Sequence, residues 1–157
     1  MNSEAANPLR IALFASGNGS NVERIAHFFK DSSLAQASIV FTNNPKAGVL
    51  TRAHQLGIPS VTLSRNEYSS GNHLNQALSE ANIDFIVLAG WLKQIPDELK
   101  RLGHLEVLFL ARNKISILPV WVGGLGHLRR LDLTYNRITP RELSLLKMKM
   151  PRCTITP

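Results

Sequence analysis

The residues best suited to chemistry lie where a short apolar segment runs into a glycine-rich turn. Residues 11–15 are apolar, as in a buried strand, and the run SGNGSN follows at 16–21. Glycines let backbone N–H groups approach a phosphate, and the helix that follows directs the positive end of its dipole at the anion. Apolar spacing predicts this helix at 21–30, with Ser20 or Asn21 as its N-cap. The sequence therefore predicts an anion-binding loop formed by Ser16, Gly17, Asn18, Gly19, Ser20 and Asn21.

Side chains for covalent or metal chemistry do not form a comparable group. We find no nucleophile beside a base, no nucleotide-hydrolysis motif, and no Cys or carboxylate spacing that would complete a zinc site with a histidine. His104 and His127 stand in Leu-Gly-His-Leu segments before expected strands, which favours surface or turn positions. His27, His54 and His73 lie on expected helices. The sequence predicts no catalytic residue and no metal.

The elements that must position this loop alternate regularly over the first 95 residues. Short apolar segments predict strands at 11–15, 37–42, 60–63 and 84–89, and helical spacing predicts helices at 21–30, 49–56 and 72–81. Strands that are apolar on both faces are typical of a parallel sheet covered by helices on both sides. The pattern predicts a doubly wound, Rossmann-like α/β fold, in which ligands lie at the carboxyl ends of the strands.

The rhythm changes after Pro96, where two segments repeat with a period of 23 residues. Residues 105–115 and 128–138 share the pattern L-x-x-L-x-L-x-x-N-x-I, which resembles leucine-rich repeats. The resemblance implies inward leucines and isoleucines, and ladder asparagines at Asn113 and Asn136 whose amides bond turn backbone. Phe109 and Tyr135 would either contact a partner or pack under a helix of the first half. A helix at 140–150 and a strand at 153–156 would form a third, degenerate unit that caps the sheet.

Four ordered segments of the first half, at 16–21, 41–44, 53–59 and 85–92, resemble the N-terminal half of phosphoribosylglycinamide formyltransferase. That family is folate-dependent and acts in purine synthesis, and the resemblance covers residues 10–95. It implies that the predicted loop, from Gly19 into Val22 and Glu23, holds the phosphate of glycinamide ribonucleotide. It also implies a remnant of the pocket for 10-formyltetrahydrofolate, formed largely by the backbone of Leu92, Lys93, Gln94 and Ile95. Gly71 stands in a segment where the family often has arginine.

The chain departs from the formyltransferase pattern at Pro96. The family's chemistry rests on an Asn-x-His-Pro-Ser motif after the next strand and on a later Asp, and this motif is missing from the sequence. An amine that attacks a formyl carbon needs a donor for the oxyanion and a group that takes the proton. We therefore expect no catalysis and no bound cofactor, although the resembled family uses 10-formyltetrahydrofolate.

The two halves are expected to form one continuous domain. Residues 1–9 would be a flexible N-terminus, 10–95 the formyltransferase-like half, and 96–157 the leucine-rich-repeat half with its C-terminal cap. In the doubly wound order 3-2-1-4-5-6, the repeat strands at 105–110 and 128–133 would take positions five and six, reached through a helix at 91–102. The sheet would then have six or seven strands. Pairing of 84–89 with 105–110 would distinguish this fused sheet from two separate modules.

Composition limits the partners. Residues 1–95 carry seven Lys/Arg and six Asp/Glu, whereas residues 96–157 carry eleven and five, which concentrates the net charge of +7 in the second half. These basic residues are scattered without interleaved aromatic residues, so nucleic-acid binding is not favoured. No apolar run nears the ~20 residues of a membrane span, and the polar start lacks a signal-peptide core. The single cysteine, Cys153, excludes an internal disulfide and indicates a cytoplasmic setting.

Three functions remain open. The first is an engineered chimeric scaffold that joins a truncated formyltransferase fragment to leucine-rich repeats, without catalysis but with weak binding of phosphate or a phosphorylated small molecule. The second is residual folate-dependent formyl transfer in purine biosynthesis. The third is a protein-interaction module that uses the repeat strands, although two repeats are few for such a surface, so a protein partner is not expected.

Overall fold

The computed structural model describes residues 7–64, 72–91, 97–101 and 105–157, which form one parallel sheet of seven strands. The strands are β1 (Leu9–Phe14), β2 (Ala35–Thr42), β3 (Ser60–Thr62), β4 (Phe85–Leu88), β5 (Val107–Phe109), β6 (Arg130–Asp132) and β7 (Thr154–Thr156). The α-helices are α1 (Ser20–Phe29), α2 (Gly48–Gln55), α4 (Asn72–Glu80) and α5 (Pro140–Lys149), and two 3-10 helices are η1 (Asp97–Arg101) and η2 (Val120–Gly124). None of these helices is long and apolar enough to span a membrane.

The strand order is β3-β2-β1-β4-β5-β6-β7, which confirms the predicted doubly wound order and adds β7 at the edge. The junction between the halves lies inside the sheet, because β4 pairs in parallel with β5. Phe85 lies opposite Val107, and Val87 opposite Phe109. The repeat strands therefore continue the sheet of the first half, as the prediction of one fused sheet required.

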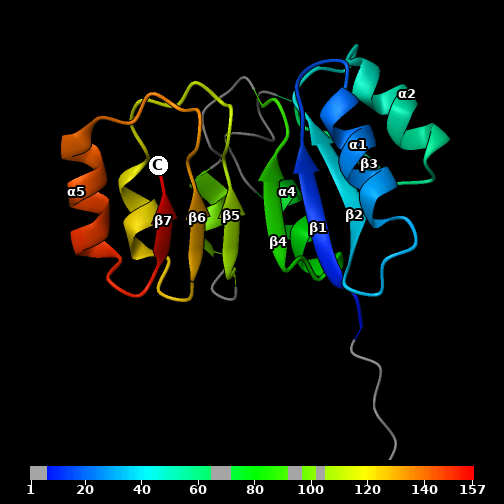
Figure 1. Cartoon of the computed structure of the whole chain (residues 1–157). Helices are drawn as coiled ribbons and strands as arrows, with labels where there is room; N and C mark the ends of the chain where they lie inside the picture. Colours follow the sequence, from blue (N-terminus) through cyan, green and yellow to red (C-terminus); the bar gives the residue numbers. More distant parts are fainter. Residues whose placement is uncertain (1–6, 65–71, 92–96, 102–104) are drawn as a thin grey trace, which may run out of the picture.

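Side chains alternate between the two faces of the sheet and build a core on each. On one face, Leu13 of β1 and Val40 of β2 pack with Val22 of α1 and Val49 of α2. The core of the other face takes its side chains from α4, η1, η2 and α5, and continues from Ile86 of β4 to Leu131 of β6. Figure 1 shows α1 and α2 beside β1–β3 and α5 at the β7 end. Both faces are thus covered in the first half.

In the repeat half, the helices that the structure describes pack on one face of the sheet. The connections after β5 and β6 run through η2 and α5, which pack into the same core as α4. Tyr135 is 75% exposed, and the guanidinium carbon of Arg112 lies 4.5 Å from the centre of its ring. Phe109 is half-buried, with Arg130 5.6 Å from its ring centre. Of the two alternatives for Tyr135, packing under a helix of the first half is therefore wrong.

The asparagine ladder predicted from the repeats is present. The Asn136 side-chain amide donates to Leu110 O (2.7 Å) and Leu133 O (2.9 Å). Its oxygen accepts from the backbone N–H of Asn113 (3.1 Å) and Ile115 (2.9 Å). These bonds give partners to backbone N–H and C=O groups in the turns, which have none within the sheet itself. The asparagines that recur with the 23-residue period therefore have the role that the repeat pattern predicted.

One local prediction is wrong. Neither Ser20 nor Asn21 caps α1, because Gly19 occupies the N-cap with φ 81°. The helix expected over 91–102 is described only in part. Trp91 lies outside a helix, is 1% exposed and packs edge-on against Phe14 at 5.3 Å, whereas residues 97–101 form the 3-10 helix η1. Residues 92–96 and 102 lie outside the described residues.

Candidate phosphate-binding site

The glycine-rich turn after β1 leads directly into α1. Gly19 has φ 81°, and a Cβ added there would lie 2.6 Å from Val49 Cγ2, so the position requires glycine. α1 begins at Ser20, and its first internal bond runs from Glu23 N–H to Gly19 O (3.0 Å). The N–H groups of Ser20, Asn21 and Val22 thus have no acceptor within the helix, and the N-cap residue, a glycine, has no side chain that could accept from them. Together they form the kind of donor group that binds an anion.

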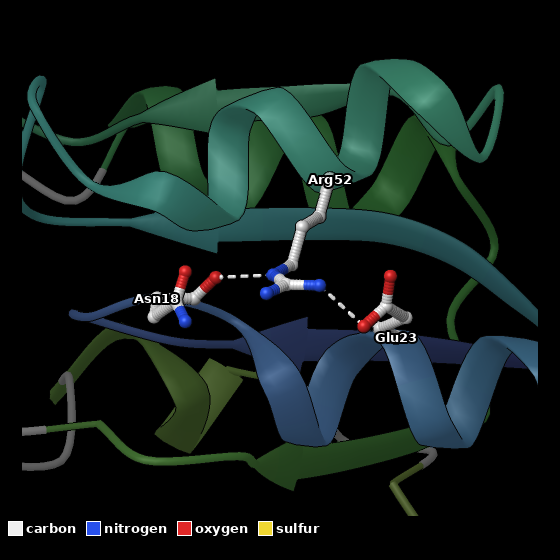
Figure 2. A network of polar contacts seen from close by, with 3 residues as sticks. All are labelled: Asn18, Glu23 and Arg52. Atoms are coloured by element: carbon white, nitrogen blue, oxygen red, sulfur yellow. Dashed lines mark hydrogen bonds and ion pairs between the residues drawn. The ribbon is translucent and has the colours of Figure 1, made fainter.

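The start of α2 holds this loop from one side (Figure 2). Val49 N–H donates to Gly17 O (3.1 Å), and Arg52 Nε donates to Asn18 O (2.9 Å). The same guanidinium also pairs with the Glu23 carboxylate. The Glu23 charge is therefore balanced by Arg52 rather than directed at an incoming anion. Arg52 was not among the residues predicted from the sequence.

The carboxyl end of β4 holds the loop from the other side. Ser16 N–H donates to Gly90 O (3.1 Å), and Gly90 itself has φ 91°. Next to this contact is a cavity of about 230 Å³. Its lining combines residues of α1, the end of β4 and the turn after β5: Asn21, Arg24, Ile25, Val87, Leu88, Ala89, Gly90, Ala111 and Arg112. Asn21 belongs to both loop and cavity, so a phosphate at the loop would leave the cavity for the rest of a small molecule.

The charges near the cavity are favourable to an anion. Arg24 and Arg112 line it, and Arg24 is exposed on the first half of α1. No carboxylate is among the lining residues. Arg24 and Arg112 are both exposed, so their attraction for a phosphate is screened by solvent, and the Arg112 guanidinium also lies over the Tyr135 ring. The arrangement suits a small phosphorylated ligand.

Asn113 lies directly after β5, in the segment where the formyltransferase resemblance would place the Asn-x-His-Pro-Ser motif. Its side-chain N–H₂ donates to the carbonyls of Leu88, Leu110 and Ala111, each at 2.9 Å. Its oxygen accepts from Trp91 N–H at 3.2 Å. The amide is therefore committed to backbone, and it has no donor left for a reacting oxygen.

The predicted loop residues are brought together, but they contribute differently. Gly17, Asn18, Ser20 and Asn21 are exposed, whereas Val22 is fully buried and can act only through its backbone. The predicted folate-pocket residues Leu92, Lys93, Gln94 and Ile95, and also Gly71 and His104, lie outside the described residues. His127 is exposed in a turn before β6, as predicted. Within the described part of the chain, no three His, Cys, Asp or Glu residues group as metal ligands.

Comparison with known families gives two matches. The sequence model of the family described as Formyl transferase matches residues 9–131, and that of the Leucine Rich Repeat matches residues 127–147. The formyl transferase match thus continues past Pro96, through β5 and into β6. It overlaps the region in which the sequence pattern shows repeats.

Curated relatives agree with the first match. The chain is 35% identical over 95 residues to phosphoribosylglycinamide formyltransferase of Bacillus subtilis, which covers 57% of this chain and 49% of the relative. It is 34% identical over 123 residues to the chloroplastic phosphoribosylglycinamide formyltransferase of Arabidopsis thaliana, which covers 74% and 41%. The chain therefore spans about half the length, or less, of these relatives.

Solved structures give the same likeness in three dimensions. Phosphoribosylglycinamide formyltransferase from Anaplasma phagocytophilum superimposes with a TM-score of 0.56 at 32% identity, over 62% of this chain and 47% of the other. Glycinamide ribonucleotide transformylase 1 from Geobacillus kaustophilus superimposes with a TM-score of 0.55 at 28% identity, over 59% and 52%.

Proposed function

Because the chain belongs to the formyl transferase family, we propose that it binds a phosphorylated substrate of the glycinamide ribonucleotide class for folate-dependent formyl transfer. The phosphate would lie at residues 17–23, and the amine-bearing remainder in the cavity beside Arg24 and Arg112. The observation that carries the proposal is the uncapped start of α1, which opens next to a cavity without carboxylates.

In this proposal the chain's residues bind and orient the substrate. The amides of Ser20, Asn21 and Val22 hold the phosphate, and Arg52 keeps the loop in shape through Asn18 O. The relatives' names indicate formyl transfer, and by the resemblance 10-formyltetrahydrofolate would supply the formyl group. The segment that would contact it by resemblance, Leu92 to Ile95, lies outside the described residues.

The transfer step itself lacks support from the residues that follow β5. A positioned acid or base accelerates proton transfer by roughly 10²- to 10⁴-fold, and the sequence at 110–119 after β5 contains no His, Asp or Glu. Asn113, which could serve only as a donor to an oxyanion, is already bonded to backbone. We therefore expect formyl transfer slower than that of the Bacillus subtilis relative by about 10²-fold or more. Substrate binding does not depend on these groups and would be retained.

A scaffold without catalysis, of engineered origin, is the second candidate. It is favoured by the missing motif and by the commitment of Asn113 to the ladder. The extension of the formyl transferase match to residue 131 favours instead a chain that follows the family through β5. A protein-interaction role would use the uncovered strand positions of the repeats, which carry Phe109 and Arg130.

The test is a titration of the isotope-labelled chain with inorganic phosphate and with glycinamide ribonucleotide, followed by amide NMR. We expect shifts confined to residues 16–24 and 87–90, with tighter binding of the ribonucleotide than of phosphate. Arg24→Met should weaken both, whereas Arg141→Met on α5, with the same change of charge, should not. Shifts elsewhere, or none at millimolar ligand, would contradict the proposal. Formyl transfer from 10-formyltetrahydrofolate, assayed on the same samples, separates the enzyme from the scaffold.

A further inference from the structure

Asn113 belongs to the first repeat, yet two of its side-chain bonds reach across to the end of β4. Its N–H₂ donates to Leu88 O at 2.9 Å, and its oxygen accepts from Trp91 N–H at 3.2 Å. These two bonds close the turn from Leu88 to Trp91. The turn that ends a strand of the first half is thus held by a ladder asparagine of the second half.

The same turn carries part of the candidate site. Leu88, Ala89 and Gly90 line the cavity, and Gly90 O accepts from Ser16 N–H at 3.1 Å. Ser16 is the residue from which the glycine-rich loop starts, and its hydroxyl bonds Asn43 Oδ1 at 2.6 Å. One short turn therefore lies between the Asn113 side chain and the backbone amide that anchors the loop.

Asn113 has little freedom of its own. Its backbone N–H donates to Asn136 Oδ1 at 3.1 Å, and its side chain also bonds the carbonyls of its own turn. Arg112 and Lys114 on either side have φ of 61° and 57°. Residues other than glycine rarely adopt this left-handed conformation, which persists only where the surroundings determine it. The ladder supplies such surroundings, so the repeat turn can impose its geometry on β4.

We propose that Asn113 is a positioning residue for the ligand site, through which the repeat half sets the affinity of the loop for phosphate. This inference rests on the proposed phosphate binding. Asn113 does not contact the ligand itself. It fixes the Leu88–Trp91 turn, the turn fixes Ser16 through Gly90 O, and Ser16 fixes the start of the loop. Arg112, which precedes Asn113 in the turn after β5, lines the cavity.

The chain offers a matched control, because Asn136 makes the same kind of ladder bonds one repeat farther from β4. Asn113→Ala and Asn136→Ala would be compared in the full chain by three measurements. These are the phosphate dissociation constant from amide NMR, the hydrogen-exchange rate of the Ser16 amide without ligand, and the midpoint of urea unfolding. Both variants should lower the unfolding midpoint, since both remove ladder bonds.

Asn113→Ala should raise the dissociation constant for phosphate by about fivefold or more and should speed exchange of the Ser16 amide. Asn136→Ala frees the backbone N–H of Asn113 but leaves both side-chain bonds of Asn113 to β4 in place, so it should have a smaller effect on both quantities. Equal effects of the two variants on Ser16 exchange, or none from Asn113→Ala, would overturn the inference. If Asn113→Ala does not fold, Asn113→Ser, whose hydroxyl keeps one short donor, is judged by the same measurements. If the unaltered chain does not bind phosphate, the proposed function fails, and Ser16 exchange alone decides the inference.

Discussion

Gly19→Ala should destabilise the chain strongly, for two reasons that the structure separates. The backbone at Gly19 is left-handed, with φ 81°, which costs a residue with a Cβ roughly 1–2 kcal/mol. The added Cβ would also lie 2.6 Å from Val49 Cγ2 and 2.8 Å from Val49 Cα, and the second of these is backbone that cannot rotate away. Overpacking of this kind costs a further ~1–3 kcal/mol. The expected loss of unfolding free energy is therefore about 2–5 kcal/mol.

Two other glycines provide matched controls for the two contributions. A Cβ at Gly57 would meet nothing within 4 Å, but its φ is 68°, so Gly57→Ala should show the conformational cost alone. Gly17 has neither a left-handed φ nor a neighbour within 4 Å, so Gly17→Ala should change stability by less than about 0.5 kcal/mol. Urea unfolding at constant m-value measures all three variants. If Gly19→Ala costs no more than Gly57→Ala, the close approach of α2 to the loop is not as described.

Three smaller predictions concern other contacts. Arg52→Met removes the guanidinium that pairs with Glu23 and should lower the unfolding free energy by about 1 kcal/mol, because the pair is partly exposed; an unchanged urea midpoint would contradict this. Burial raises the pKa of the Cys153 thiol, so alkylation by iodoacetamide at pH 8 should be slower than that of a free thiol. Because the thiol has a lower pKa in the unfolded chain than in the folded one, the free energy of unfolding should fall as the pH rises above the ordinary value of 9.0. Urea unfolding at pH 8 and at pH 10 measures this decrease. Thr139→Ala removes the cap on the N–H of Glu142 and should cost about 1 kcal/mol while leaving phosphate affinity unchanged.

The architecture was predictable because each half has a strong repeating pattern. Alternation of apolar strands with amphipathic helices predicted the order of β1 to β4, and the 23-residue period predicted β5 and β6 with their ladder asparagines. Because crossovers between parallel strands are right-handed, the strands of the second half were expected to continue the sheet next to β4. The pairing of Phe85 with Val107 is a consequence of this order rather than of any local signal.

The candidate site could be predicted from the sequence only where its residues are contiguous. The loop at 17–23 carries its own glycine signal, but Arg52 reaches it from 29 residues away and Arg112 from the second half. No spacing rule connects such positions, since they meet only after the sheet has formed. The N-cap prediction failed because serine and asparagine usually outrank glycine there. At Gly19 the close approach of Val49 and the left-handed turn outweigh that preference.

The most direct measurement is the amide NMR titration of the unaltered chain with inorganic phosphate. The account predicts saturable shifts at Gly19 to Glu23, with smaller ones at Ser16 and Gly90, because those amides share the hydrogen-bond path between the loop and β4. A chain whose spectrum is well dispersed but does not change at these residues would contradict the claim that the start of α1 is a phosphate site.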